Sequence, residues 1–582
     1  LRHGSGPLSV SARAEEAPGG EGGGVAVDFS NPVPDPSAID ADRLFERDKL
    51  HPCVIMWSLG NESGGGCNAD AMYELLRSRS GLPVHYEGAI HSRRRAYDVG
   101  SEMYPTVERV ISVGEGRSSV RRLNDRPYVL CEYAHAMGVG PGGIEDYWRQ
   151  IYAHEALAGG CVWEMADHAV LHEGGGYTYG GDHGEWEHDG NFCCDGIFYP
   201  DRTPSTGARV VRHAYRPLRV RHVGGDFFMV FNATSFTPGD AFLLRFEWSD
   251  GGVAELVCDV DPLRQQSLLV RPTEQGAADE GEGLRRNRMR WVTVSVTRRE
   301  TGEEVSREQM ALTEMAPLDA DLLERRVSFP EGCEVGEKGL ALPGAMAPAA
   351  EPLLLTRVST DNDRDLAGNR PLEEFYDVCR EVVGVSRGEG SVVVTTRLAL
   401  PRHQFLCTTT YEAVAAGVLV TARLHCERGR GDLPRFGMCY RLDSSWDEVD
   451  YLGRNGESYR DMCEQAQIER VSCRVGDMTE PNIRPQESGN RMDCQYVRLT
   501  DGERRVQITA VSRPFELGVK PYSDAELRAM RHRGDEVRTG TYLTVQAFQM
   551  GVGTGSCGPA TRPEYRFGCR EDYELSYLVS WE

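Results

Sequence analysis

The sequence predicts a multidomain protein with an α/β part followed by all-β parts. The chain has 582 residues, enough for about three domains at roughly 100–200 residues each. Between residues 46 and 215, short apolar segments alternate with helical stretches, a rhythm typical of a parallel β/α architecture. From residue 216 onward, apolar and polar residues alternate between turn residues, which is typical of β-sandwiches.

Residues 1–45 are rich in Gly, Pro, Ala and acidic residues, as in "EEAPGGEGGG", and show no apolar periodicity. We expect this segment to be a loop or a disordered insertion that contributes no core. The chain starts with Leu1 rather than Met, which is compatible with a leader or further domains upstream.

The α/β part is predicted to span residues 46–215, and polar or aromatic side chains follow each of its five expected strands. The expected strands are "VIMWSLGN", "PVHYEG", "DVGSEMY", "PYVLCEY" and "GGCVWEMAD", with helices at 68–79, around 106–123 and at 143–156. The strand-end residues are Asn61 and Glu62, Glu87, Glu102 and Tyr104, Glu132 and His135, and Trp163 and Asp167. A (β/α)8 barrel builds its active site from such strand ends.

Two all-β domains are expected next. Residues 216–318 contain strand patterns such as "AFLLRFEWSDGG" and predict an immunoglobulin-like β-sandwich, with residues 271–287 as an exposed loop. Residues 319–582 contain longer strand patterns such as "GSVVVTTRLAL" and predict a large antiparallel domain.

Composition narrows the function. With 65 basic and 89 acidic side chains the net charge is −24, which disfavours nucleic acid and anionic membranes as partners. Seventeen cysteines without metal or disulfide spacing indicate reduced thiols and a cytoplasmic location. No apolar run of about 20 residues predicts a membrane span. We therefore expect a neutral or small substrate.

Glu62 in "SLGNE" and Glu132 in "VLCEYAH" each follow a buried strand directly, where desolvation and neighbours can tune a carboxyl group. Glycoside cleavage with retained configuration needs two carboxyl groups about 5–5.5 Å apart, which makes these two residues candidates. Alternatively, each is an ordinary strand-end acid that a helix N-terminus or an Arg satisfies. The pattern alone does not decide between these interpretations.

Four segments together resemble the β-galactosidases of glycoside hydrolase family 2, in the same order and with similar spacing. They are "FERDKLHPCVIMWSLGNESGGG", "RPYVLCEYAHAMG", "GGCVWEMADHAV" and "YGGDHGEWEHDGNFCCDGIFYPDRTP". The resemblance continues through "STDNDRD", "YLGRNGESYRD", "RPQESGNR" and "MGVGTGSCGP", from about residue 43 to the end. It implies TIM-barrel strands four to eight, an immunoglobulin-like sandwich and a domain similar to the β-galactosidase small chain.

The resemblance also implies roles. Glu62 is expected to be the general acid/base and Glu132 the nucleophile, while Asn61 bonds the sugar 2-hydroxyl. Tyr104 is expected to hydrogen-bond the nucleophile and His135 to contact the sugar. Trp163 is expected to form an apolar wall. Alternatively, Tyr104 is only a packed tyrosine at a strand end, His135 is a core histidine with satisfied hydrogen bonds, and Trp163 is part of the barrel core.

Two cations are implied by the resemblance. Mg²⁺ would be held by Glu62 and an upstream Glu-x-His, for which only His3 in "LRHGSG" is a match. Na⁺ would be held by the backbone oxygen of Phe192 and by Asp195, which stands where the family has Asn. Alternatively, Asp195 only caps a turn before Gly196. Cys557 occupies the place of an aromatic residue that stacks on the sugar in the family.

The resemblance thus implies a retaining β-galactosidase that acts on lactose-like β-D-galactosides through a galactosyl-enzyme. A homo-oligomer, or a complementing N-terminal segment, is the expected partner, because barrel strands one to three and the N-terminal domains precede Leu1 or are absent. The alternative is an inactive fragment or complementing subunit that binds carbohydrate or assembles with a missing N-terminal part.

Overall fold

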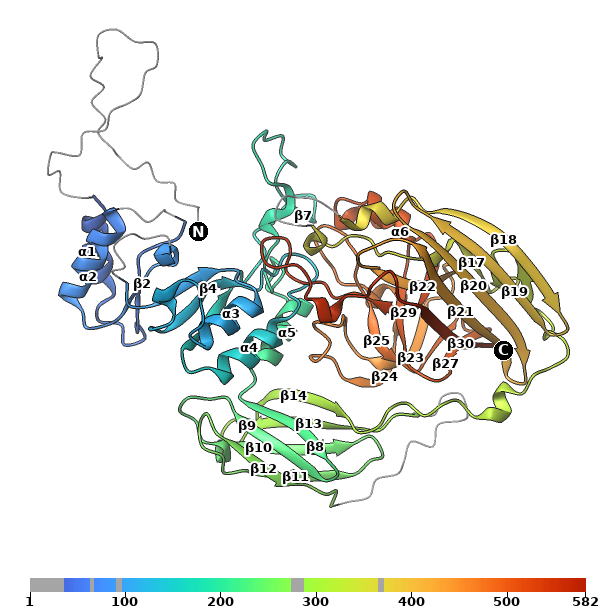
Figure 1. Ribbon diagram of the computed structural model, residues 1–582, viewed down its shortest axis with the longest axis horizontal. Helices are drawn as coiled ribbons and strands as arrows, with labels where there is room; N and C mark the ends of the chain where they lie inside the picture. Colours follow the sequence, from blue (N-terminus) through green and yellow to red (C-terminus); the bar gives the residue numbers. More distant parts are fainter. Residues whose placement is uncertain (1–35, 63–66, 91–96, 274–286, 365–370) are drawn as a thin grey trace, which may run out of the picture. The chain divides into compact units, whose positions relative to one another are not determined.

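The computed structural model describes residues 36–62, 67–90, 97–273, 287–364 and 371–582. Figure 1 shows the helices and strands of the chain, coloured along the sequence. By its internal contacts the chain divides into two compact units. Unit 1 comprises residues 1–103 and 116–131, and unit 2 comprises residues 104–115 and 132–582. In the described residues, no helix has the length and apolar character needed to span a membrane.

Unit 1 contains two helices and short strands. Helix α1 (Pro36–Asp48) packs against α2 (Cys67–Arg79), and β1 (Trp57–Ser58) pairs in parallel with β2 (Val84–His85). Strand β3 (Gly100–Met103) lies beside the first residues of β4 (Tyr128–Tyr133). The core of the α1, α2, β1 and β2 region consists of Ala41, Trp57, Leu59, Leu76, Val84, Tyr86 and Tyr97.

The prediction of a loop without core over residues 1–45 is wrong for residues 36–45, which form most of α1. Pro36 is the first helical residue, a position where proline is favoured because its missing N–H would be unpaired anyway. Ala41 is fully buried, so this segment does contribute to the core. Residues 1–35 lie outside the described part of the chain.

Unit 2 begins with the rest of the α/β part. Its elements are α3 (Val107–Gly114), α4 (Ile144–Ala153), β5 (Leu157–Val162) beside the end of β4, the β6 (Val170–Leu171) and β7 (Tyr177–Thr178) hairpin, and α5 (Thr206–Ala214). Four of the predicted strand segments contain the strands β1 to β4 and the fifth overlaps β5, which begins two residues earlier than expected, so the five strand assignments are confirmed. The helix expected around 106–123 ends at Gly114, shortly before Gly116 adopts a φ of 68°.

Two antiparallel sheets follow. The first has the order β12-β9-β8 and the second the order β11-β10-β13-β14. The strands are β8 (Leu218–Gly224), β9 (Phe227–Asn232), β10 (Phe242–Trp248), β11 (Val253–Leu256), β12 (Gln265–Leu269), β13 (Trp291–Arg298) and β14 (Glu304–Ala311). One hydrophobic cluster includes Phe228 of the first sheet together with Phe246 and Val294 of the second, so the two sheets share a core. Most of the loop expected over residues 271–287 lies outside the described residues.

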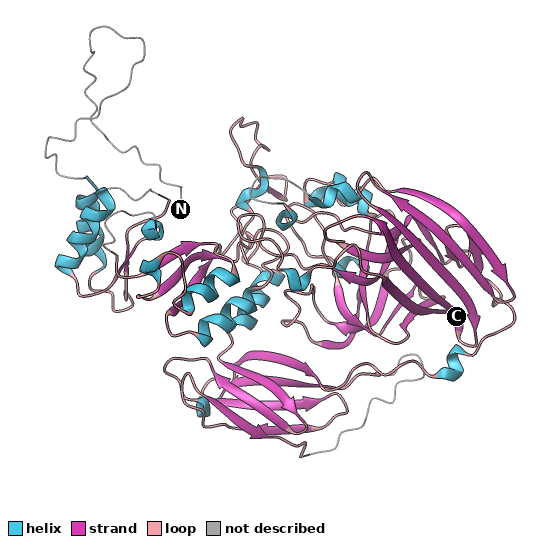
Figure 2. Ribbon diagram, in the orientation of Figure 1, coloured by secondary structure: helices cyan, strands magenta, loops and turns pink. Residues whose placement is uncertain are grey.

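The carboxyl-terminal β region contains strands β15 to β30 and a single α-helix among its described residues, α6 (Asp524–Ala529) (Figure 2). A five-stranded sheet has the order β17-β22-β29-β28-β25, and a nine-stranded sheet has the order β18-β19-β20-β21-β30-β27-β26-β23-β24. The five-stranded sheet consists of β17 (Met346–Leu354), β22 (Arg435–Leu442), β25 (Arg491–Cys494), β28 (Phe515–Lys520) and β29 (Thr541–Gln549).

The nine-stranded sheet consists of β18 (Cys379–Gly388), β19 (Ser391–Ala399), β20 (Gln404–Val414), β21 (Gly417–Arg428), β23 (Glu448–Arg454), β24 (Ile468–Arg474), β26 (Tyr496–Thr500), β27 (Arg505–Ala510) and β30 (Tyr573–Trp581). The small hairpin β15 (Glu334–Gly336) and β16 (Gly339–Ala341) precedes both sheets. Tyr440 of the smaller sheet and Tyr577 of the larger sheet share a buried 2.6 Å hydrogen bond, so the sheets meet through a common core.

Arg357 ties together two loops of the carboxyl-terminal β region. Its side chain is fully buried and binds both carboxylate oxygens of Asp363, at 3.0 and 2.7 Å. The same guanidinium donates to the carbonyl oxygens of Met550 and Gly551. The loop after β17 is therefore fixed to the loop after β29.

We expect Arg357→Ala to lower the free energy of unfolding by about 3–5 kcal/mol, because the buried Asp363 carboxylate would lose its partner. Arg423→Ala is the control, since its ion pair with Glu574 is 63% and 45% exposed at the two side chains and should contribute at most about 1 kcal/mol. Denaturant unfolding followed by fluorescence measures both variants. Equal losses would contradict the assignment.

Candidate active site

In unit 1, the predicted acids Glu62 and Glu87 lie next to each other. Asn61 and Glu62 lie three and four residues after the end of β1, and the Glu62 side chain is exposed. The backbone N–H of Glu62 donates to the carboxylate of Glu87 at 3.3 Å. Glu87 follows β2, the parallel partner of β1, so the two strand ends meet at one edge. Glu62 and Glu132 belong to different units, and their pairing across a substrate stays a prediction.

In unit 2, Tyr104 and Glu132 form a hydrogen-bonded pair. The Tyr104 hydroxyl donates to Glu132 Oε2 at 2.8 Å, and the backbone N–H of Tyr104 donates to the Glu132 carbonyl at 2.8 Å. Glu132 is buried. Burial, followed by the negative charge of Glu132, raises the pKa of Tyr104 well above its usual value. The phenol therefore stays protonated and donates to the carboxylate.

His135 and Trp163 lie in the same cluster. The His135 ring is 5.8 Å from the Tyr104 ring, and its Nε2 atom is 3.7 Å from Asp195 Oδ2. The Trp163 indole N–H donates to that same oxygen at 2.9 Å. Burial, aided by the positive charge of Arg364, lowers the pKa of His135 to about 4. His135 is therefore neutral at physiological pH, and its contact with a sugar stays a prediction.

Backbone strain coincides with the predicted strand ends. Six non-glycine residues in the described part of the chain have positive φ, and three of them are Glu62 (47°), Tyr104 (46°) and Ala134 (53°). The left-handed region costs an ordinary residue of order 1 kcal/mol. Such strain persists where the surrounding structure imposes it, and it is concentrated at functional sites. The three residues follow β1, β3 and β4.

A group of carboxyl groups borders His135. Asp195 Oδ1 is buried and accepts no hydrogen bond from any described residue, and burial raises the pKa of Asp195. Burial and then the charge of Asp195 raise the pKa of Glu164 to about 7. Burial likewise raises the pKa of Asp167 to about 7. An unpaired buried carboxylate oxygen of this kind fits a bound cation.

The interpretation of Asp195 as a turn cap before Gly196 is wrong. The backbone N–H of Gly196 donates to Asp167 Oδ1 at 2.8 Å instead, while Asp195 binds Trp163. The predicted Na⁺ ligands Phe192 and Asp195 thus include one buried carboxyl oxygen, Asp195 Oδ1, beside the Glu164 carboxyl group. For Mg²⁺ at Glu62 there is no corresponding support, because the described residues contain no group of three His, Cys, Asp or Glu side chains suited to a metal. His3 lies outside the described residues.

Sequence reasoning missed Asn362 and the role of Ser556. Both come from the carboxyl-terminal β region, yet Ser556 Oγ is 2.7 Å from His135 Nδ1 and 2.7 Å from Asn362 Oδ1. The available signal was that "STDNDRD" and "MGVGTGSCGP" belong to the resemblance. The next residue, Cys557, is half-buried, and its electrostatic interaction with Tyr104 is one of the smaller causes of the raised pKa of Tyr104.

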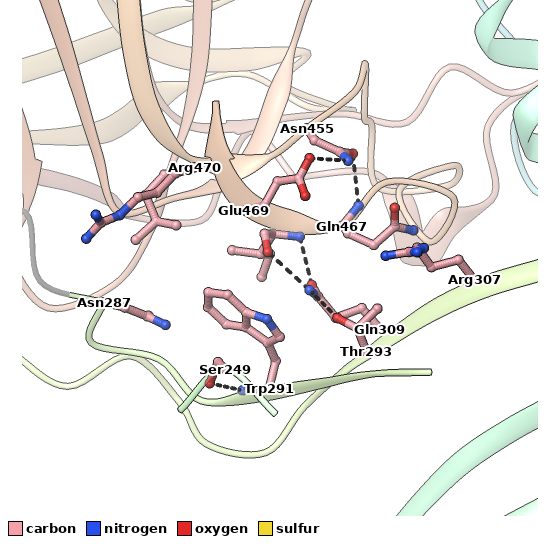
Figure 3. Close-up of a pocket in the computed structure, with 12 residues that line it drawn as sticks. Ser249, Asn287, Trp291, Thr293, Arg307, Gln309, Asn455, Gln467, Glu469 and Arg470 are labelled. Carbon is pink, nitrogen blue, oxygen red and sulfur yellow. Dashed lines mark hydrogen bonds between the residues drawn. The ribbon is translucent and has the colours of Figure 1, made fainter. Parts of the chain in front are cut away.

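A cavity lies elsewhere in unit 2, where the β13-β14 sheet meets β24 (Figure 3). It has a volume of about 560 Å³, and Trp291 and Glu469 are among its lining residues. Gln309 bonds both the N–H and the C=O of Ile468 across it, at 2.7 and 3.1 Å. None of the predicted site residues lines this cavity, so it is separate from the candidate active site.

Comparison with known proteins gives two family matches. Residues 27–220 match "Glycosyl hydrolases family 2, TIM barrel domain", and residues 336–579 match "Beta galactosidase small chain". A solved structure of Bacteroides uniformis β-glucuronidase 2, in a calcium-binding mutant form, aligns with 77% of this chain and 54% of its own at 10% identity. The TM-score of this alignment is 0.25.

Three curated β-galactosidases align along most of this chain. The protein of Staphylococcus xylosus is 27% identical over 580 residues, covering 92% of this chain and 57% of its own. That of Priestia megaterium is 29% identical, covering 96% and 57%. That of Arthrobacter sp. is 30% identical, covering 92% and 59%. The chain thus spans a little more than half the length of these relatives, and two of its regions match the models of the glycoside hydrolase family 2 barrel and of the β-galactosidase small chain.

Proposed function

We propose that this chain supplies both catalytic carboxyl groups of a retaining β-galactosidase. The enzyme would hydrolyse terminal β-D-galactosides, lactose among them, through a galactosyl-enzyme intermediate. The observation that carries the proposal is the hydrogen bond from Tyr104 to Glu132 beside the neutral His135. The names of the aligned relatives support galactosides as the substrate class.

In the proposed mechanism, Glu132 attacks the anomeric carbon while Glu62 protonates the departing oxygen. Glu62 then removes a proton from water, which releases galactose and restores the Glu132 carboxylate. The Tyr104 hydroxyl orients the Glu132 carboxylate before attack. A hydrogen bond to a charged carboxylate is stronger than one to an ester, so Tyr104 also favours the departure of Glu132 in the second step.

The remaining residues are proposed to bind the sugar and cations. Asn61 would bond the 2-hydroxyl, His135 would accept a hydroxyl hydrogen, and Trp163 would wall the pocket. The Phe192 carbonyl and Asp195 would hold Na⁺, which supplies positive charge for orienting sugar oxygens when bound. Because Cys557 has no aromatic face, we propose that apolar stacking at this position is absent.

The same proposal extends to architecture and setting. It includes barrel strands four to eight, an immunoglobulin-like sandwich and a small-chain-like carboxyl-terminal domain. It also includes a cytoplasmic location and either a homo-oligomer or a complementing N-terminal segment. A non-catalytic subunit that only binds carbohydrate is the competing function, and the aligned relatives, which are named as enzymes, support it less.

We expect the purified chain, alone or mixed with the N-terminal segment of a β-galactosidase relative, to hydrolyse a chromogenic β-galactoside. Glu132→Gln should lower turnover by at least about 10³-fold, because the amide is a poor nucleophile. Glu255→Gln on β11, an exposed carboxylate, is the matched control and should leave turnover unchanged. Sugar binding without hydrolysis in either mixture would instead identify a binding subunit.

Tyr104→Phe tests the hydrogen bond to Glu132. We expect kcat to fall about 10- to 100-fold, the effect of removing a hydrogen bond to a charged group, with a smaller change in KM. Circular dichroism should be unchanged, because the ring that packs on His135 is retained. A rise in KM at constant kcat would mean that Tyr104 contacts only the bound sugar.

A further inference from the structure

His135 belongs to a chain of hydrogen bonds whose directions can be determined. Its Nδ1 atom is 2.7 Å from Ser556 Oγ, and Ser556 Oγ is 2.7 Å from Asn362 Oδ1. Asn362 Nδ2 lies 3.0 Å from the Met137 carbonyl oxygen and 2.9 Å from that of Val139. All three side chains are buried. Because buried polar groups must be paired, only one assignment of the hydrogens satisfies every bond in this hydrogen-bonded series.

The Asn362 carboxamide has only one consistent orientation. Two carbonyl oxygens face one end of it, and carbonyl oxygens only accept, so that end must be the NH₂ group. The opposite end is then the carbonyl oxygen, which accepts the backbone N–H of Ser556 at 3.2 Å. The reversed orientation would place oxygen against oxygen twice and N–H against N–H once. The Asn362 oxygen is therefore an acceptor.

The remaining protons follow from this orientation. At 2.7 Å from the Asn362 oxygen, the Ser556 hydroxyl must donate its single hydrogen to that oxygen. It can then only accept from His135, so His135 Nδ1 must carry a hydrogen. In the neutral ring the other nitrogen, Nε2, is left with a lone pair. Among the described residues, no N–H or O–H group donates to Nε2 within hydrogen-bonding distance.

The group that faces Nε2 is also an acceptor. Asp195 Oδ2 lies 3.7 Å away, and its bond from the Trp163 indole is already made. Two acceptors at this separation repel each other unless a donor lies between them. A hydroxyl group can donate its single hydrogen to Nε2, whereas an acceptor group cannot bond to this lone pair. The Nε2 lone pair therefore requires a hydrogen donor, and a hydroxyl group is such a donor.

We propose that Asn362 and Ser556 are positioning residues that hold His135 as the Nδ1–H tautomer, so that Nε2 accepts a hydrogen bond from a hydroxyl group of the bound sugar. The sugar half of this inference rests on the proposed function, whereas the tautomer does not. Residues of the carboxyl-terminal β region, more than 200 positions away in sequence, thus determine which ring nitrogen of His135 carries the hydrogen.

Solid-state NMR of the full chain labelled with ¹⁵N-histidine tests the tautomer. His135 signals are assigned by their loss in His135→Gln. We expect a protonated Nδ1 and an unprotonated Nε2 in the native protein and in Ser556→Thr, which keeps the hydroxyl. In Ser556→Ala the Nδ1–H loses its acceptor, and the Nε2–H form should become populated. Thr554→Ala, whose hydroxyl bonds Pro559 in the same loop, is the control and should match the native spectrum.

A protonated Nε2 in the native protein, or the same spectrum in Ser556→Ala, would overturn the inference. Galactose tests its second half, because binding should shift the Nε2 resonance and weaken about five- to tenfold in Ser556→Ala. A galactose titration that leaves Nε2 unmoved would overturn the sugar contact. If the tautomer and the galactose response hold but no galactoside is hydrolysed, the proposed function fails while this inference stands.

Discussion

The carboxamide of Asn362 is the contact on which the candidate site in unit 2 depends. It uses both of its N–H groups on the carbonyls of Met137 and Val139 and its oxygen on Ser556. Leaving any one of these buried groups unpaired would cost about 1–3 kcal/mol. The loop after β4 and two loops of the carboxyl-terminal β region are therefore expected to dock cooperatively, because separating any one of them would leave a buried polar group unpaired.

Backbone contacts strengthen this docking. Asp461 accepts hydrogen bonds from the N–H groups of Val552 and Gly553, and the N–H of Gly142 donates to the Gly553 carbonyl. A Cβ on Gly142 would come within 2.1 Å of an Asp461 carboxylate oxygen, so only glycine allows the approach. These bonds fix the main chain of the loop that bears Ser556. The fixed main chain holds the Ser556 hydroxyl within hydrogen-bonding distance of His135.

Several features of the site lower the stability of the fold. Tyr104 and Ala134 adopt strained positive φ angles, and the half-buried Glu164 lies beside the buried Asp195, both with raised pKa values. Packing alone would favour relaxed angles and neutral side chains. The surrounding network keeps Glu132 and His135 in one arrangement, which pre-organises them for charge that develops in a reaction.

The sequence by itself determined the order of the α/β and β parts, the five short strands before residue 163 and the two strand-end glutamates, because hydrophobic periodicity and local motifs are set by near neighbours. It misassigned residues 36–45, where proline at a helix start looks like a loop signal. Only the tertiary structure decided that Ser556 contacts His135, 421 residues away, and that Asp167 rather than Asp195 holds Gly196. These contacts depend on how separate domains dock, and the residues at such a docking surface show no periodic pattern in the sequence.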